Sequence, residues 1–283
     1  MILIDNKNLK EVELDGKPVK EIYDNNTGEL MWFYGEEPVP VTEEYFYIKN
    51  EYSGKNTVHV MVFYEPSHRP TDYARTIEYS MDKVNWTSFE FEEQTYPYVQ
   101  LEIDLDDGDI VYFRNDNCYF STLGWQIVFH LVYDYSVGGD ILSLLDYTNK
   151  SSVSMQDRCF FGLLGSIPGE SIYNTGLVDA SKLILPETTS DYCYYSMFYE
   201  AHNMLHGPEL PAKTLSPYSY KLMYYGCSSL LDIYTHADDI SATECTRWWV
   251  DDVSATGTFH NLGSAVYTSG DDGIPSGWTV VTS

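Results

Sequence analysis

Four aspartates lie between residues 104 and 109, and carboxylates are common calcium ligands. Their spacing decides whether they can form a calcium site. The carboxylates belong to Asp104, Asp106, Asp107 and Asp109. A calcium loop of the EF-hand kind that began at Asp104 would need an oxygen ligand at its fifth position, and the chain has Gly108 there. The spacing therefore predicts a solvated turn between two strands and no calcium site.

Histidine offers a second candidate metal site, because His202 and His206 are spaced so that two ligands would share one face of a helix. Gly207 and Pro208 follow at once and end such a helix, and no third ligand is adjacent. The pattern predicts no metal ion, and no cofactor is expected.

Catalytic motifs are absent from the sequence, which contains no nucleophile elbow (GxSxG), P-loop, GxGxxG or HExxH. A glycosidase needs two carboxylates about 5–10 Å apart, and a chain with 43 Asp and Glu residues does not reveal such a pair. We therefore expect a protein that is not an enzyme and has no catalytic residue. A glycan-degrading activity is the less favoured alternative.

The balance of charge excludes two classes of partner. The chain has 283 residues, with 16 Lys and Arg against 43 Asp and Glu, for a formal net charge of −27. Nucleic acids and anionic bilayers bind basic surfaces, so neither is expected as a partner. No run of 18 apolar residues that could span a membrane occurs.

Five cysteines, an odd number with no CxxC pair, indicate reduced and mostly buried thiols. The first residues, MILIDNKNLKEVELDGK, lack the basic cluster, apolar segment and small-residue cleavage site of a secretory signal. Both observations predict synthesis in a reducing cytoplasm.

The elements that would carry a binding surface follow from the periodicity of apolar residues. In residues 1–35 these alternate with polar residues on both sides of an NNTG turn (25–28), which predicts a β-hairpin. A hairpin of this size buries no core of its own, so we expect it to dock on another protein. The residues expected at that contact are Val12, Leu14, Val19, Ile22, Leu30 and Trp32. Residues 36–44, acidic and containing two prolines, predict a semi-stiff linker.

Residues 45–135 are rich in aromatic and β-branched residues separated by turn signals, and seven short strands at this spacing predict an antiparallel β-sandwich. The strands are expected at 45–49, 58–64, 76–81, 88–91, 99–105, 110–114 and 126–133. Two glycines at 138 and 139 then break the pattern, and residues 140–147 predict a short helix with Asp140 as its N-cap.

An internal repeat follows in the C-terminal half. Cys193, Ser219 and Cys245 are 26 residues apart, and short strands are expected at 183–185 and 232–234. Within one copy, apolar residues recur at i, i+4, i+8 and i+11, the pattern of a short helix. That face consists of Cys193, Met197, Ala201 and Met204. One strand, turn and helix every ~25 residues lies in the range of leucine-rich repeats.

Several of these segments resemble BspA-like leucine-rich repeats, of the tyrosine-rich variety found in gut Bacteroidales and in tail or fibre proteins of their phages, crAss-like phages included. The resemblance lies in LILPETTSDYCYYSMF (183–198), PELPAKTLSPYSYKLMYYGCSSLL (208–231) and WVDDVSATGTF…GIPSGWTV (249–280). IEYSMDKVNWTSF (77–89) and IDLDDGDIVYFRND (103–116) are similar to the β-sandwich that often precedes such repeats. NLKEVELDGKPVKEIYDNNTGELMW (8–32) looks like the attachment hairpin of phage virion proteins.

The resemblance implies a mostly β protein with short helices. Its parts would be a virion-attachment β-hairpin (1–35), a linker (36–44), an antiparallel β-sandwich (45–135) and a leucine-rich-repeat solenoid with a C-terminal cap (136–283). It further implies a structural virion protein of a bacteriophage, a tail or head fibre component made in the host cytoplasm and assembled as a homo-oligomer. The hairpin would bind other virion proteins, and the repeats would bind a host-surface glycan or protein. The alternative, a bacterial surface adhesin of the same repeat family, would need a secretion signal or lipid-anchor cysteine near its start.

Aromatic rings supply the candidate contact surface. Aligning the repeats places Phe198, Tyr224 and Val250 at one position, which indicates packed side chains, whereas positions that alternate between aromatic and charged residues should face solvent. The candidate receptor-binding residues are Tyr195, Tyr199, Tyr225 and Trp248. Such rings offer contact area and a polar group at a small entropy cost. The alternative is that they cover neighbouring turns of the solenoid.

Overall fold

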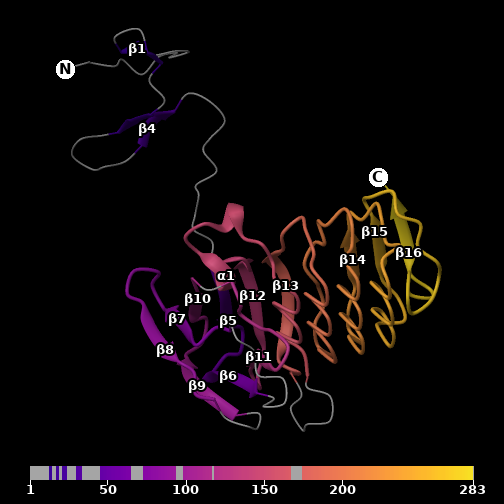
Figure 1. The fold of residues 1–283 in the computed structure, drawn as a ribbon, viewed down its shortest axis with the longest axis horizontal. Helices are drawn as coiled ribbons and strands as arrows, with labels where there is room; N and C mark the ends of the chain where they lie inside the picture. The colour runs from indigo at the N-terminus through magenta and orange to yellow at the C-terminus, as the bar shows by residue number, and fades with distance from the viewer. Residues whose placement is uncertain are drawn as a thin grey trace. The chain divides into compact units, whose positions relative to one another are not determined.

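In the computed structural model the chain is mostly β and falls into two compact units, Met1–Glu44 and Tyr45–Ser283 (Figure 1). The structure describes residues 45–64, 73–93, 98–116, 118–166 and 174–282, together with four short strands of the first unit. Within these residues, helix is confined to α1 (Ser143–Asp146) and a 3₁₀ turn, η2 (Lys150–Ser152). The expectation of a mostly β fold is confirmed.

The described residues of the first unit form two pairs of antiparallel strands where the sequence predicted one hairpin. β1 (Glu13–Leu14) pairs with β2 (Lys17–Pro18), and β3 (Glu21–Tyr23) pairs with β4 (Leu30–Phe33). The β3–β4 pair is the predicted hairpin, and it sets the backbone of Ile22 opposite that of Trp32.

The six residues expected to contact another virion protein are divided between these pairs and the rest of the unit. Leu14 lies in β1, Ile22 in β3, and Leu30 and Trp32 in β4. Val12 and Val19 lie outside the described residues, as does the predicted linker at 36–44.

The second unit begins with two sheets. One has six strands in the order β13-β12-β5-β10-β7-β8, antiparallel except for the parallel pair β12–β13. Its strands are β5 (Phe46–Asn50), β7 (Thr76–Ser80), β8 (Thr87–Glu90), β10 (Ile110–Arg114), β12 (Tyr135–Asp140) and β13 (Leu177–Ile184). The other sheet is antiparallel, in the order β11-β6-β9, with β6 (Asn56–Tyr64), β9 (Tyr98–Leu105) and β11 (Trp125–His130).

Alternation along the strands builds the core between the two sheets. Phe46 and Ile48 of β5 are fully buried, and the residues between and after them are partly exposed. The ring of Phe46 lies 5.4 Å from that of Phe129 in β11, and Phe113 of β10 lies 4.8 Å from the same ring. A strand is present at each of the seven places predicted between residues 45 and 133, but β11 ends at His130, so the last strand was predicted three residues too long.

Glycines 138 and 139 do not end the strand pattern as predicted, because they lie inside β12. A Cβ at Gly138 would collide with the side chain of Tyr47, and one at Gly139, where φ is 77°, would collide with the carbonyl oxygen of Tyr45. The two glycines therefore allow β12 to lie close against β5, and the prediction that they break the strand pattern was wrong.

The helix predicted over residues 140–147 is wrong in its start and its length. Asp140 is the last residue of β12, and α1 has four residues, Ser143–Asp146. The Asp140 carboxylate accepts a hydrogen bond from the N–H of Leu142 (2.9 Å), so it closes the turn between strand and helix and does not cap the helix.

Beyond β13 the six-stranded sheet continues into a stack of parallel strands. Single bridges join Asp179 of β13 to His206, and His206 to Asp232. β14 (Asp232–Thr235) pairs in parallel with β15 (Thr258–Asn261), which pairs with β16 (Thr279–Thr282). The register of β14 on β15 is offset by 26 residues, the spacing of the sequence repeat. Of the two short strands predicted in the repeats, one is the start of β14 and the other the end of β13.

The opposite side of the stack consists of four segments of turns, which we call the turn ladder: residues 158–166, 192–201, 218–227 and 244–252. Alternate N–H groups donate to the next segment, as Tyr194 does to the carbonyl of Ser219 and Ser196 to that of Lys221, both at 3.0 Å. The intervening N–H groups donate three residues back, as Met197 does to Tyr194 (3.1 Å). The segments are thus hydrogen bonded to one another as strands are, although each is a run of turns.

The short helices predicted in the repeats are wrong for the turn ladder. Tyr192, Ser196 and Glu200 have φ between 55° and 59°, so every fourth residue is left-handed, which an α-helix of L-residues does not accommodate. Cys193 and Met197 are fully buried nevertheless. A four-residue period of turns places i and i+4 on one side, as the 3.6-residue period of a helix does, and this similarity produced the wrong prediction.

The turn ladder also continues the three-stranded sheet, because the N–H of Phe129 in β11 donates to the carbonyl of Leu163 (2.9 Å). Both sheets therefore extend into the stack, with one contiguous apolar core between them. The domain boundary predicted between residues 135 and 136 falls at the first residue of β12, within the six-stranded sheet.

Candidate functional site

The turn ladder carries rows of partly exposed aromatic rings that stack between neighbouring segments. The stacked pairs are Phe161 with Tyr195 (centroids 4.8 Å apart, interplanar angle 7°), Tyr192 with Tyr218 (4.4 Å, 5°) and Tyr199 with Tyr225 (5.0 Å, 10°). Each pair joins equivalent positions of hydrogen-bonded segments, so the backbone register sets the stacking. Since the rings lie face to face, they present mainly their edges, and the tyrosines their hydroxyl groups, to a partner.

Three cations lie among these rings. The guanidinium of Arg158 is 4.1 Å from the ring centroid of Tyr192. Lys221 Nζ lies 5.4 Å from the Tyr218 ring and 5.6 Å from that of Trp248, and Arg247 lies 4.4 Å from Trp248. At such distances the positive charge is attracted to the face of each ring. The cations therefore lie within the rows of stacked rings, at positions that have no aromatic residue.

Carboxylates balance two of these cations. Lys221 Nζ donates to Glu244 Oε2 (2.5 Å), and Arg247 pairs with Asp272 (3.4 Å). Burial by itself lowers the pKa of Lys221, but the hydrogen bond and charge of Glu244 outweigh it and the pKa is raised. The same hydrogen bond lowers the pKa of Glu244, so both groups are charged at neutral pH.

Two tyrosine hydroxyls of the ladder are held in their neutral form. Loss of solvent, followed by the nearby carboxylate of Glu200, raises the pKa of Tyr199. Loss of solvent also raises the pKa of Tyr218, and the neighbouring Tyr192 adds to the shift. Both phenols can therefore donate hydrogen bonds at neutral pH.

The four predicted binding residues form two groups. Tyr199 and Tyr225 stack on each other, while Tyr195 and Trp248 lie on either side of Lys221, whose Nζ is 6.0 Å from the Tyr195 ring. Trp248 is 41% exposed, and the three tyrosines are partly exposed. The stacking shows that these rings do cover neighbouring turns, which is compatible with contact through their outer edges.

Sequence reasoning missed several residues of the same rows. Tyr192 and Tyr218 are 26 residues apart, so the repeat alignment that selected Tyr199 contained the signal for them. Arg158 is 34 residues from Tyr192 and gave no such signal, because a longer segment separates the first two turns of the ladder.

The two histidines at helical spacing bind different partners. His202 Nδ1 lies 2.7 Å from the carbonyl oxygen of Gly226, and His206 Nδ1 lies 2.6 Å from Asp232 Oδ2. In the described part of the chain, no three side chains of His, Cys, Asp or Glu are grouped as ligands of one metal ion.

The packed position of the repeat alignment is confirmed, since Phe198, Tyr224 and Val250 are all buried.

Comparison of the chain with protein-family models, with curated proteins and with solved structures finds no match. Across the described residues, the helices are too short to reach from one side of a bilayer to the other.

Proposed function

We propose that the chain is a non-enzymatic structural protein of a bacteriophage virion, a tail or head fibre component, whose stack is a BspA-like leucine-rich-repeat solenoid following a β-sandwich. The observation that carries the proposal is the repeating layer, with one parallel strand on one side and one turn segment on the other at an offset of 26 residues. Layers that bury their apolar side chains only against neighbouring layers form rigid scaffolds with long outward surfaces, which suit display and binding.

The first unit supports a role in attachment. It is compact by itself, and its described residues form two short strand pairs, a number too small to be stable alone in water. A partner would supply the missing apolar surface, either another virion protein or a further copy of this chain in a homo-oligomer.

Contact with a host-surface glycan or protein would involve Tyr195, Tyr199, Tyr225 and Trp248. Stacking fixes the three tyrosine rings before binding, so little side-chain entropy would be lost there. The tyrosine hydroxyls would donate and accept hydrogen bonds, and the exposed part of Trp248 would provide apolar area.

Gold-labelled antibody against the full chain tests the location. We expect gold on the tail or head of purified particles. Gold on the surface of uninfected bacteria would support the adhesin instead, and gold at neither place would overturn the proposal.

Binding of the fluorescent full chain to cells of the phage's host tests the surface. Tyr195→Phe, Tyr199→Phe and Tyr225→Phe remove hydroxyls and keep the stacked rings, and Trp248→Ala removes the exposed indole. We expect the combined variant to bind about tenfold more weakly or worse. Tyr52→Phe, at an exposed tyrosine outside the ladder, is the matched control. Unchanged binding by the combined variant would exclude these residues as the contact surface.

A further inference from the structure

A pocket of about 160 Å³ lies on the six-stranded sheet, apart from the turn ladder. It is lined by Thr76, Glu78, Ser88, Asn115, Asp116 and Tyr147. Glu78 and Arg114 alternate with the buried Ile77 and Phe113, so they face away from the core. At ~30 Å³ per water the space holds about five waters, which is room for one small polar ligand.

One wall of the pocket is fixed by Arg114. Its guanidinium lies 3.9 Å from the ring centroid of Trp86 and 4.1 Å from that of Tyr147, and its Nε donates to Glu78 Oε2 (2.7 Å). The Arg114 side chain is only 16% exposed. Glu78 and Tyr147 are therefore held in position by a residue that is itself packed between two rings.

The other wall is fixed by Asn115, which is 3% exposed. Its Nδ2 donates to the carbonyl of Thr76 (2.9 Å), and its Oδ1 accepts from the N–H of Asp116 (2.8 Å). Its backbone carbonyl accepts from the N–H of Tyr147 (3.0 Å). The rim residues Asp116 and Tyr147 are thus both hydrogen bonded to one buried residue, and a ligand would meet a preformed site.

The groups in the pocket select the chemistry of a ligand. Carboxylates only accept hydrogen bonds, whereas the hydroxyls of Ser88 and Thr76 both donate and accept. Two carboxylates against one guanidinium disfavour an anion. A cationic ligand would find only the exposed carboxylate of Asp116, which is worth little in water, because Arg114 already pairs with Glu78 and covers one face of Tyr147.

A ligand with several neutral hydroxyl groups satisfies these conditions. Its hydroxyls would donate to the Asp116 carboxylate and to the acceptor sites of Glu78 not used by Arg114, and would exchange hydrogen bonds with Ser88. We propose that this pocket binds one sugar unit of a neutral glycan. The site shares no residue with the turn ladder, so it does not depend on the function proposed above.

Saturation-transfer NMR of the full chain with the methyl glycosides of glucose, galactose, mannose and N-acetylglucosamine tests the proposal. We expect at least one to bind with a dissociation constant in the millimolar range, as is usual for a ligand of this size. Asp116→Ala and Ser88→Ala, both at exposed positions, should each weaken binding at least fivefold, or about the loss of one hydrogen bond. Asp107→Ala, at an exposed aspartate in the β9–β10 turn, should leave binding unchanged. Thermal melting checks that the variants are folded.

A matched ligand pair tests the charge selection. Methyl glucuronide differs from methyl glucoside by one carboxylate, and we expect it to bind at least tenfold more weakly. The proposal is wrong if none of the four neutral sugars binds, if the two pocket variants bind as the wild type does, or if methyl glucuronide or choline binds better than every neutral sugar.

Discussion

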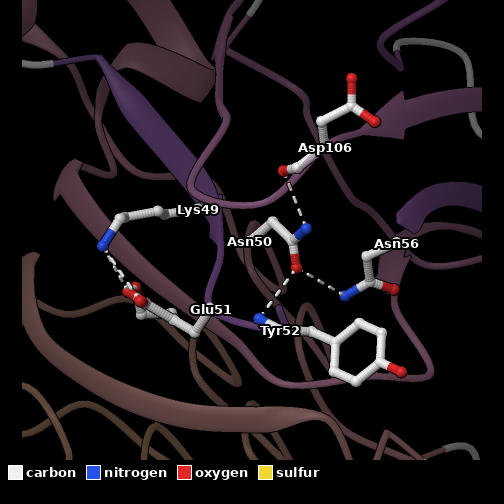
Figure 2. A network of polar contacts seen from close by, with 7 residues as sticks. Lys49, Asn50, Glu51, Tyr52, Asn56 and Asp106 are labelled. Carbon is white, nitrogen blue, oxygen red and sulfur yellow. Dashed lines mark hydrogen bonds and ion pairs between the residues drawn. The ribbon is translucent and has the colours of Figure 1, made fainter. Parts of the chain in front are cut away.

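Replacement of Asn50 by aspartate changes one buried side chain that joins the two sheets of the second unit. Asn50 is the last residue of β5 and is fully buried. Its Nδ2 donates to the carbonyl oxygens of Gly54 (2.8 Å) and Asp106 (2.9 Å), and its Oδ1 accepts from the N–H of Tyr52 (3.1 Å), as Figure 2 shows in part. Asp106 follows β9 of the other sheet, so this one amide connects both sheets and two loops.

The size of the effect follows from these contacts. Asn50→Asp removes two short donated hydrogen bonds, each contributing about 1 kcal/mol net. The new carboxylate only accepts, so it would face two carbonyl oxygens without a proton between them, and this adds about 1–3 kcal/mol. We expect the free energy of unfolding to fall by about 3–5 kcal/mol in total.

Thermal unfolding at neutral pH measures this loss. In a unit of 150–250 residues, 1 kcal/mol corresponds to about 2–4 °C, so the Tm should fall by about 6–20 °C. Asn203→Asp is the matched control, because Asn203 is exposed and its Nδ2 donates a single hydrogen bond, to the carbonyl of Thr175 (2.8 Å). The control should change Tm by less than about 4 °C.

The dependence on pH separates this explanation from a general loss of packing. Burial beside carbonyl oxygens raises the pKa of the introduced carboxyl in the folded variant above its value in the unfolded chain. Protonation of this carboxyl therefore stabilises the folded variant. The protonated form regains one donor, and the difference in Tm from the wild type should narrow as the pH falls toward 4. A variant at position 50 that melts within about 2 °C of the wild type, or whose deficit grows in acid, would refute the reasoning.

Three further predictions concern other positions of the second unit. In chemical denaturation, Gly139→Ala should lower the free energy of unfolding by about 2–4 kcal/mol, because position 139 combines a positive φ with a collision of the new Cβ against a carbonyl oxygen. Gly108→Ala is the control: φ is positive there as well (76°), but the space around the Cβ is open, so the loss should be only about 1 kcal/mol. A maleimide should modify one thiol of the native chain, Cys118, because the other four cysteines are buried and burial raises their pKa values; modification of a second thiol in mass spectra would contradict this. The N–H of Asn85 and further donors hold the pKa of Asp82 well below its usual range, so Asp82→Ala should lower the Tm at pH 7. Since a depressed pKa stabilises the fold above the unfolded value of ~3.9, the Tm difference should shrink as the pH falls below about 4, and a difference that stays constant would argue against it.

The strands of residues 45–133 were predictable because one face of each sheet is buried, which makes apolar and polar residues alternate along the strand. Phe46 and Ile48 face the core and Tyr47 and Lys49 do not, so the period of two is visible in the sequence. Strand β12 was missed because its glycines are explained only by a distant neighbour. Gly138 lies close to Tyr47, which is 91 residues away in the sequence.

The turn ladder shows a different limit of sequence reasoning. The repeat spacing of 26 residues correctly identified stacked units, and it also selected Tyr199 and Tyr225, which stack on each other. The local conformation was wrong because left-handed residues recur at Tyr192 and Ser196, which are residue types that do not indicate a positive φ.

The pocket on the six-stranded sheet, which we propose binds a sugar unit, could not be predicted from the sequence. Glu78 and Tyr147 of its lining, and Arg114 which holds both, come from three separate segments, and no spacing among them matches a known motif. Only the pairing of β7 with β10 brings Glu78 beside Arg114.

The continuity of both sheets explains why a change of sequence pattern near residue 135 does not separate two cores. β12 pairs antiparallel with β5 on one edge and parallel with β13 on the other, so the change from antiparallel to parallel pairing occurs within one sheet. On the opposite side, the hydrogen bond from Phe129 to Leu163 joins an extended strand to a run of turns. Strands and turn segments can follow one another in this way because both present backbone donors and acceptors at the same spacing between layers. The strands that precede the stack therefore cover the apolar side chains of its first layer, as a terminal cap does in a repeat protein.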